Sequence, residues 1–303
     1  MKKNKKLNKL SILGYLILLL GLIFIMIPLV NRTYNQIISN KRLDDFYQEQ
    51  LKRTSEDIEK ENKQIEKYNE LVSNSESTST DPFIENENEA SFNYLEDKND
   101  IFGYLIIPKI EKRLPIYLGA SMENMEKGVG QLAGTHIPVG GKNTRSVIAG
   151  HRGWWGDTMF LYVDELEKGD YVYVERANKT LRYKVDSKEV ISKYDWEKLD
   201  PIKDKDMLTL LTCMPFGTVG KDEKRFLVNT ISDEEYNNPK KTEDKDNKTT
   251  NLNNLVQSEN QNNEIPFLVK IFNIGMMIAA AIAMLSFIYI LIRFIKRIRM
   301  TFN

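Results

Sequence analysis

The chain has 303 residues, and its 43 basic and 43 acidic side chains leave a formal net charge of zero. This balance neither favours nor excludes a nucleic-acid partner. No phosphate-binding loop or dinucleotide fingerprint is present, so we expect neither a nucleic acid nor a nucleotide cofactor. The single cysteine rules out a disulfide within the chain. Stability must therefore come from an ordinary hydrophobic core, and the thiol is free.

Two uncharged apolar segments lie near the ends of the chain, at 10–30 and 271–292, and the second apolar stretch begins near Ile265. Each is long enough to cross a hydrocarbon layer of roughly 30 Å as a helix. Lysines precede the first segment, and Lys and Arg follow the second. By the positive-inside rule both termini lie in the cytoplasm and residues 31–264 lie outside the cell membrane. A cleaved signal peptide is the alternative for the first segment, although no small-x-small cleavage site follows it.

A charged helical arm is predicted over 33–72. Apolar residues recur every seven positions in this segment, at Leu51, Ile58, Ile65 and Val72, and together they form a narrow stripe. We expect this stripe to pack on the domain that follows. A coiled-coil partner is the alternative, but the stripe is too sparse in apolar residues to support it well. A linker rich in Ser, Thr and Asn follows the arm.

From about residue 101 the sequence changes to short β-prone runs separated by turns rich in Gly, Pro, Asp and Asn. The runs are 102–108, 113–118, 146–150, 171–175, 180–185, 207–213 and 225–231. Seven or eight short strands over roughly 130 residues predict a mainly β domain, either a closed barrel or a sandwich. Short helices are expected at 121–127 and 157–166.

Cys213 stands at the end of one of these runs. Pro215 and Gly217 break that run, and Arg225 begins the next one. If the two strands pair antiparallel, Arg225 lies beside Cys213 and places a fixed positive charge next to the thiol. A neighbouring cation favours the thiolate, which is the nucleophilic form.

The chain has only two histidines. His151 ends an apolar run, as Cys213 does, and is therefore the expected general base. His136 lies in a turn-rich loop and is the weaker candidate. Arg152 is the rival of Arg225, but neighbours on a strand face opposite sides, so it should point away from a site that His151 faces. The spacing of the cysteine and the histidines fits no metal-binding motif, and no Gly-x-Ser-x-Gly motif is present, so we expect no metal and no cofactor.

These motifs resemble those of sortases, the cell-surface cysteine transpeptidases of Gram-positive bacteria. Thr209-Leu-Leu-Thr212-Cys213 matches the TLxTC signature, Ala149-Gly-His151-Arg-Gly matches the histidine motif, and Arg225 follows in order. The resemblance covers about residues 81 to 231. Three features make the chain similar to class C sortases, which polymerise pilins: Asp81-Pro82-Phe83, the loop around His136 and the C-terminal apolar segment.

The resemblance implies an eight-stranded sortase β-barrel with short helices, preceded by the helical arm and flanked by two transmembrane helices. It also implies that Cys213 attacks the Thr–Gly bond of an LPxTG-like sorting signal on a pilin precursor. His151 would act as general acid and base, and Arg225 would hold the substrate or stabilise the oxyanion. A lysine amine of the next pilin subunit would accept the acyl group. Thr209 and Thr212 of the signature are the expected substrate-binding positions.

In related enzymes a lid covers the cysteine, and here Asp81, Pro82 and Phe83 would form it. Two other functions stay open. One is a sortase that anchors surface proteins to a peptidoglycan precursor, and the lid motif argues against it. The other is a non-catalytic assembly scaffold, and the presence of Cys213 and His151 together with Arg225 argues against that.

The predicted organisation has eight parts. They are a cytoplasmic basic tail (1–9), a transmembrane helix (10–30), the helical arm and linker (31–80), a lid loop region (81–100), the catalytic β-barrel (101–232), a flexible tether (233–264), a second transmembrane helix (265–292) and a second cytoplasmic tail (293–303).

Overall fold

The computed structural model describes residues 2–74, 81–83, 101–153, 157–176, 179–214, 224–234 and 266–302. The expected linker after the arm, most of the lid region, the loop after Cys213 and most of the tether lie outside these residues. The chain forms two compact units. One consists of Met1–Ile38, Trp155–Asp157 and Phe267–Asn303, and the other of Ser39–Trp154 and Thr158–Pro266.

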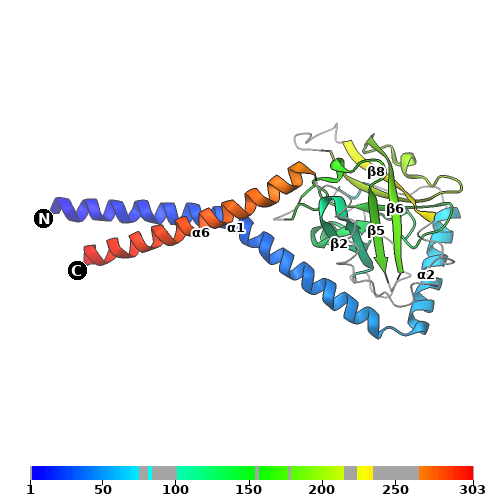
Figure 1. Ribbon diagram of the computed structural model, residues 1–303, viewed down its shortest axis with the longest axis horizontal. Coiled ribbons are helices and arrows are strands. Elements are labelled where there is room, and N and C mark those ends of the chain that lie inside the picture. Colours follow the sequence, from blue (N-terminus) through cyan, green and yellow to red (C-terminus); the bar gives the residue numbers. More distant parts are fainter. Residues whose placement is uncertain are drawn as a thin grey trace. The chain divides into compact units, whose positions relative to one another are not determined.

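In the second unit eight strands close into a barrel in the order β1-β2-β3-β4-β7-β8-β6-β5 (Figure 1). The strands are β1 (Gly103–Ile107), β2 (Lys112–Leu118), β3 (Val129–Gln131), β4 (Thr144–Ala149), β5 (Tyr171–Arg176), β6 (Lys179–Ser192), β7 (Asp206–Cys213) and β8 (Lys224–Ser232). The pairs β2–β3 and β4–β7 are parallel, and the other pairs are antiparallel. The predicted mainly β domain is confirmed, and it is the closed barrel rather than the sandwich.

Two parts of the sheet were not predicted from the sequence. Strand β3 has only three residues, and its Gly130 packs so closely on the preceding loop that a Cβ would lie 2.4 Å from the Cα of Ala120. Strand β6 continues to Ser192 beyond an irregularity between Val185 and Ser187. The irregularity shifts the strand register, which hides the alternation of polar and apolar residues on which sequence recognition depends.

The predicted helix at 121–127 is confirmed as α3 (Met122–Lys127), which Ser121 caps by accepting a 3.2 Å hydrogen bond from the Asn124 N–H. The predicted helix at 157–166 is wrong. That segment forms turns and the short 3-10 helix η2 (Val163–Glu165). Met159 adopts a φ of 38°, and the Phe160 N–H donates to the carbonyl of His151 at 3.1 Å. Both features prevent the helical backbone hydrogen bonds that the first turn of a helix in this segment would need. Two further 3-10 helices are η1 (Pro108–Ile110) and η3 (Trp196–Leu199).

The arm consists of two helices, because α1 runs from Lys2 to Lys52 and α2 from Ser55 to Asn74. The break lies at Arg53 and Thr54, where a reciprocal pair of hydrogen bonds caps the second helix. Thr54 Oγ1 accepts from the Asp57 N–H at 3.1 Å, and the Thr54 N–H donates to Asp57 Oδ2 at 3.1 Å. No such break separates the predicted transmembrane segment from the arm, since α1 continues through both.

The apolar stripe of the arm packs against the barrel, as predicted, but only along α2. Ile65 is 1% exposed, and Ile58 and Val72 are half-buried. Leu51 precedes the break and is 68% exposed. The Asn69 amide fixes the helix by pairing with the backbone of Ile137, accepting from its N–H at 2.9 Å and donating to its carbonyl at 3.4 Å.

The last turns of α1 contact the barrel through aromatic side chains. Phe46 is 4% exposed and packs edge-to-face on Tyr104 with ring centroids 5.2 Å apart. Beside it, the Tyr47 hydroxyl donates to Glu175 Oε2 at 2.9 Å. Burial raises the pKa of Glu175 to about 7.

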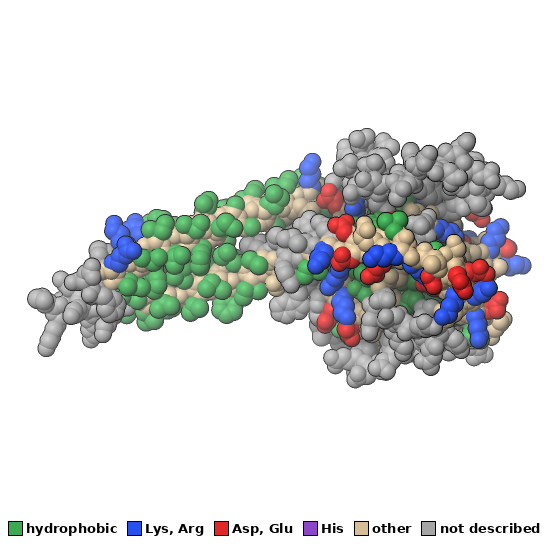
Figure 2. All heavy atoms as spheres, turned by 90° about the horizontal axis from the view of Figure 1, so that it is seen from below, with side chains coloured by type: hydrophobic (Ala, Val, Ile, Leu, Met, Phe, Trp, Pro, Cys, Tyr) green, Lys and Arg blue, Asp and Glu red, His purple; other side chains and the backbone are tan. Residues whose placement is uncertain are grey.

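The first unit contains the N-terminal part of α1 and the helix α6 (Phe267–Phe302). The segments Leu10–Ile27 and Phe267–Arg299 are long and apolar enough to cross a membrane, and 6% of each is buried. Figure 2 shows hydrophobic side chains covering the visible surface of both helices. Arg297 Nη2 of α6 donates to Ser11 Oγ of α1 at 3.4 Å, so the two helices contact one another.

Candidate active site

Cys213 is the last residue of β7, and the register of β7 with β8 places it directly opposite Arg225. The predicted antiparallel pairing of these two residues is confirmed. The Met214 N–H donates to the Lys224 carbonyl at 3.1 Å and continues the ladder beyond the cysteine. Cys213 is partly exposed and forms no disulfide. A partly exposed thiol is thus held on a rigid strand end next to a guanidinium.

Arg225 is 1% exposed and carries its charge below the protein surface. Its Nε donates to Asp81 Oδ1 at 3.1 Å, its Nη2 pairs with Asp81 Oδ2, and its Nη1 donates to the Lys224 carbonyl at 3.1 Å. Asp81 is itself 3% exposed. A buried guanidinium needs such a partner, because an isolated charge in the protein interior is costly. The bidentate contact therefore holds Asp81 and its neighbours firmly at the end of β8.

His151 follows β4 and is held by backbone contacts on both sides. The Gly150 N–H donates to the Leu211 carbonyl at 3.1 Å, and Thr212 Oγ1 donates to the Gly150 carbonyl at 2.8 Å. A Cβ on Gly150 would lie 2.9 Å from the Phe160 ring, so only glycine allows this close approach. Burial lowers the pKa of His151, and the charge of Glu126 opposes that shift. The imidazole is therefore neutral at pH 7.

Phe83 lies between the histidine and the arginine. Its ring centroid is 6.0 Å from that of His151, and Arg225 Cζ lies 5.1 Å from its ring centroid. The Phe83 N–H donates to Asp81 Oδ1 at 3.2 Å, which turns the chain tightly at Pro82. The structure thus brings the three predicted lid residues together with His151 and Arg225, and Phe83 covers the space between them.

The apolar floor beside the site continues along the sheet. The residues packed together there are Ala120, Met125, Leu132, Val147, Ala149, Ile191, Leu199, Leu211 and Leu227, with Phe83, Met122 and Trp196 against them. Leu211 and Cys213 lie two positions apart on β7 and so share a face of the sheet. This strip is part of the buried apolar core next to the cysteine, and Phe83 packs against it.

Comparison with known proteins agrees with this arrangement. A family model described as the sortase domain matches residues 105–231. Sortase D of Bacillus subtilis is 34% identical over 141 residues, which cover 46% of this chain and 67% of that protein. The chain belongs to the sortase family.

Solved sortase structures match between 62% and 64% of this chain. Sortase C1 of GBS Pilus Island 1 gives a TM-score of 0.56 at 32% identity over 64% of this chain and 91% of that chain. Sortase C-3 of Streptococcus pneumoniae gives 0.58 at 31% identity over 63% and 89%, and sortase C of Clostridium perfringens gives 0.52 at 34% over 62% and 96%. The protein is therefore a sortase, a cysteine transpeptidase, and its structural neighbours are class C enzymes.

The two threonines of the sortase signature have structural contacts in this state. Thr209 is fully buried, accepts from Arg145 Nε at 3.0 Å and donates to Asn229 Oδ1 at 3.0 Å. Thr212 is also fully buried and donates to the carbonyl of Gly150. Both hydroxyls are thus used in contacts within the fold, and substrate binding at these two positions stays a prediction.

Arg152, the rival of Arg225, turns away from the site as predicted, although it lies in a loop and not on a strand. Its Nη2 pairs with Asp164 Oδ2 at 2.7 Å, and its Cζ lies 5.9 Å from the centroid of Phe226. Phe226 follows Arg225 on β8 and so faces the opposite side of the sheet.

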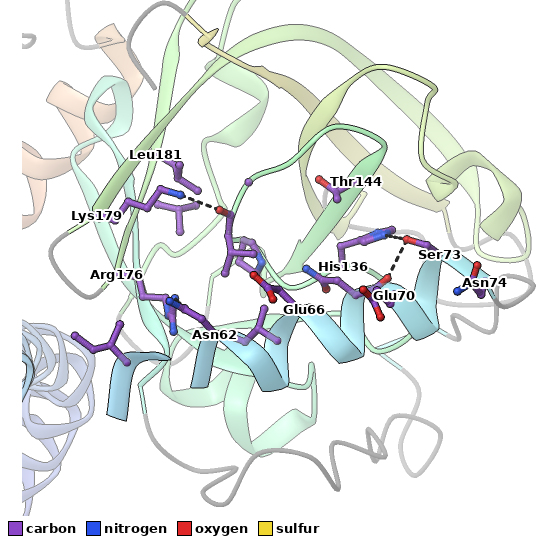
Figure 3. A pocket seen from close by; sticks show the side chains of 17 residues that line it. Asn62, Glu66, Glu70, Ser73, Asn74, His136, Thr144, Arg176, Lys179 and Leu181 are labelled. Carbon is purple, nitrogen blue, oxygen red and sulfur yellow. Dashed lines mark hydrogen bonds between the residues drawn. The ribbon is translucent and has the colours of Figure 1, made fainter. Parts of the chain in front are cut away.

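His136 is also remote from the cysteine and belongs to the contact between the barrel and α2 (Figure 3). Its Nδ1 accepts from the Arg145 N–H at 3.3 Å, which leaves Nε2 as the protonated nitrogen facing Ser73 Oγ at 3.0 Å. Ser73 Oγ in turn donates to the Asn69 carbonyl at 2.9 Å. The expectation that His136 is not the catalytic histidine agrees with this position.

A cavity of about 660 Å³ lies beside these residues, between α2 and the barrel. Figure 3 shows the side chains that line it. Thr144 lines it at the start of β4, whereas His151 follows the end of β4, so the cavity lies at the opposite end of the strand from the site. Within the described residues no group of three or more His, Cys, Asp or Glu side chains could hold a metal ion.

Proposed function

We propose that this sortase joins pilin subunits, with Cys213 as nucleophile, His151 as general acid and base, and Arg225 as the group that stabilises the oxyanion or holds the substrate. The observation that carries the proposal is the closed lid. Asp81 forms a buried ion pair with the arginine, and Phe83 lies on the histidine. The class C identity of the structural neighbours supports the same substrate class.

In the first half-reaction, Cys213 Sγ attacks the carbonyl carbon of the threonine in an LPxTG-like sorting signal. The neutral His151 accepts the thiol proton, because burial holds its pKa below the ordinary value. The C–S bond forms, the C–N bond to glycine breaks, and His151 returns the proton to the leaving amine. Arg225 stabilises the negative oxygen of the tetrahedral intermediate, a contribution of roughly 3–4 kcal/mol in other acyl-transfer enzymes.

In the second half-reaction, the side-chain amine of a lysine on the next pilin subunit attacks the thioester carbon. A C–N bond forms, the C–S bond breaks, and His151 takes up the proton that the amine loses and passes it to the departing Cys213 sulfur. The product is an isopeptide bond, and Cys213 returns to its starting state. The lid must leave the site before either step, since Asp81 occupies the Nε and Nη2 donors of Arg225 that the substrate would use.

The two apolar helices fit a protein anchored in the cell membrane at both ends. In this arrangement the barrel and its tether lie outside the cell, both basic tails lie in the cytoplasm, and α1 provides a retained anchor instead of a cleaved signal. In this proposal the arm and linker (31–80), the lid region (81–100), the barrel (101–232) and the tether (233–264) have the boundaries that the sequence predicts. Anchoring would hold the enzyme where membrane-bound pilin precursors carry their sorting signals.

The test is a ladder assay with the full-length enzyme in detergent and a pilin carrying an LPxTG-like tail. The wild type, Cys213→Ala, Phe83→Ala and the double variant are compared on a denaturing gel. Covalent ladders that require Cys213 and become stronger with Phe83→Ala support the proposal. Cleavage of the tail without ladders would mean that the acyl group is accepted by a peptidoglycan precursor or by water. Absence of both product and acyl-enzyme with the lid removed would favour a scaffold.

A further inference from the structure

The short helix α3 carries a carboxylate, Glu126, that the mechanism above does not use. The helix ends just before Gly128, and β3 begins just after that glycine. Strand β3 pairs antiparallel with β4, with Gly130 opposite Ala149. Continued by two residues, this register places Gly128 opposite His151. Glu126 therefore lies two residues before the position that faces the histidine.

Two close backbone contacts fix the end of α3 beside the histidine loop. A Cβ on Gly150, the residue before His151, would lie 2.9 Å from Val129 Cγ1. A Cβ on Gly128 would lie 2.4 Å from the carbonyl oxygen of Pro115 on β2. Packing this close allows little movement of the segment. The distance between the helix end and the imidazole is therefore set by the sheet.

Glu126 lies on the face of α3 that is turned toward the site. It follows Met122 by four residues, so the two side chains share one face of the helix. Met122 packs against the apolar cluster that contains Ala149, and Phe83 packs against the same cluster. The Phe83 ring in turn lies on His151. The Glu126 side chain is exposed, so its carboxylate stays in contact with water beside the site.

The net charge around His151 comes from Glu126 in the part of the chain that the structure describes. The other charged groups at the site form ion pairs without net charge, which are Asp81 with Arg225 and Arg152 with Asp164. The remaining titratable group of the site is the thiol of Cys213. Burial lowers the pKa of His151, and the charge of Glu126 acts against that shift. The carboxylate therefore favours the protonated imidazole.

We propose that Glu126 is a positioning residue whose carboxylate stabilises the imidazolium that forms when His151 takes up the thiol proton. The proposal rests on the function proposed above for the role of His151. Glu126 acts through the histidine and exchanges no proton with the substrate. A negative charge near an imidazolium lowers the free energy of the charged form, and so favours the pair of thiolate and imidazolium over the neutral pair.

The test is a charge series at position 126 in the full-length protein in detergent. Glu126→Gln removes one negative charge, Glu126→Lys changes the charge by two units, and Glu126→Asp keeps it. The residue is exposed, so none of these changes leaves a cavity or a buried charge. The matched control is Glu123→Gln. Glu123 is also an exposed carboxylate of α3, but it pairs with Lys127 at 2.5 Å.

The first measurement is the titration of His151 by nuclear magnetic resonance. Isotope-labelled histidine in a His136→Gln background leaves His151 as the only labelled ring. Its midpoint should move to lower pH in Glu126→Gln and about twice as far in Glu126→Lys, because the Coulomb energy is proportional to the charge. Glu126→Asp and Glu123→Gln should keep the parent midpoint.

Salt provides a second check on the same titration. Raising NaCl from about 0.1 M to about 1 M shortens the Debye length from about 10 Å to about 3 Å. An exposed carboxylate is screened under these conditions. The difference between the parent and Glu126→Gln should therefore largely disappear at the higher salt concentration, whereas a difference caused by altered packing would persist.

The second measurement is cleavage of an LPxTG peptide as a function of pH, in a Phe83→Ala background that removes the lid from the comparison. Glu126→Gln should lower kcat roughly two- to fivefold and leave KM within about twofold, because the imidazolium forms only as the reaction proceeds. The rising limb of kcat/KM should move to lower pH. Glu123→Gln should match the parent in both respects.

Equal His151 midpoints in Glu126→Gln and Glu123→Gln, or in Glu126→Gln and Glu126→Lys, would overturn the proposal. An unchanged midpoint with slower transfer to an amine would also overturn it, since Glu126 would then act on the acceptor. If the parent enzyme does not cleave the peptide, the function proposed above fails, and the titration alone decides whether Glu126 favours the charged form of His151.

Discussion

Removing the charge of Asp81 should open the lid and expose the thiol. The substitution Asp81→Asn keeps the shape of the side chain but leaves Arg225 without a counterion when the lid is closed. Both side chains of the pair are nearly inaccessible, at 3% and 2% exposure, so water cannot replace the lost charge in the closed state. In the open state the guanidinium meets solvent, and the substitution has little effect there.

The size of the effect follows from that difference. Breaking a buried ion pair by removing one partner costs about 3 kcal/mol or more. Each 1.4 kcal/mol changes an equilibrium constant tenfold, so the open fraction should rise roughly 100-fold. Phe83→Ala should give a smaller rise of about tenfold to 100-fold, because burial of an aromatic ring contributes about 1.5–3 kcal/mol.

The assay is alkylation of the full-length protein by iodoacetamide, followed by intact mass. Cys213 is the only cysteine, so every added mass reports this thiol. The rate is read at about pH 10, above the usual thiol pKa of about 8.5, where ionisation no longer limits the reaction. Asp233→Asn is the control, since it removes a carboxylate from the partly buried ion pair with Arg182 on another part of the barrel. Equal alkylation rates in Asp81→Asn and Asp233→Asn would refute the lid.

Three further outcomes follow from polar groups at the contact between the arm and the barrel. Because the pKa of Glu175 is raised to about 7, its carboxyl group keeps a proton in the folded chain that it loses in the unfolded chain. Stability is therefore lost as pH rises from about 4.5 to about 7. Glu175→Gln, which keeps an acceptor for Tyr47, should raise Tm by a few degrees at pH 8 and hardly at all at pH 5. Burial lowers the pKa of His136, so stability should fall as pH drops below about 6.5, and His136→Gln should flatten that fall in thermal unfolding from pH 5 to 7.5. Asn69→Ala leaves the Ile137 N–H unpaired at a cost of about 1–3 kcal/mol, and proteases should then cut α2 faster while the barrel resists as before.

The pairing of Cys213 with Arg225 could be predicted because the two residues are close in the sequence. Cys213 and Arg225 end and begin two β-prone runs separated by one loop, so antiparallel pairing alone brings them together. His151 was found by the same logic, since it follows a strand that runs parallel to β7 and ends at the same edge. These inferences need only the alternation of residues, the turns and the chemistry of thiols.

The nearness of Glu126 to His151 could not be found in this way. It depends on the pairing of β3 with β4, and β3 has only three residues, too few to show an alternation of polar and apolar positions. The one available signal was an acidic residue in a short charged helix, and that pattern also fits an exposed helix face. His136 is similar, because its contact with Ser73 spans 63 residues and depends on how the arm docks. Tertiary contacts of this kind leave no periodic pattern in the sequence.

We expect the proposed lid to control the ionisation of the site as well as access to it. When it is closed, the Asp81 carboxylate neutralises Arg225, and so removes the cation that would favour a thiolate at Cys213. Burial also keeps His151 neutral. We expect the closed lid to shield Cys213 from oxidants while the imidazole stays uncharged. Opening removes the carboxylate and hydrates the imidazole, and both changes favour the ion pair. The alkylation midpoint of Asp81→Asn should accordingly shift to lower pH than that of the wild type. An unchanged midpoint with a faster plateau would mean that the lid blocks access alone.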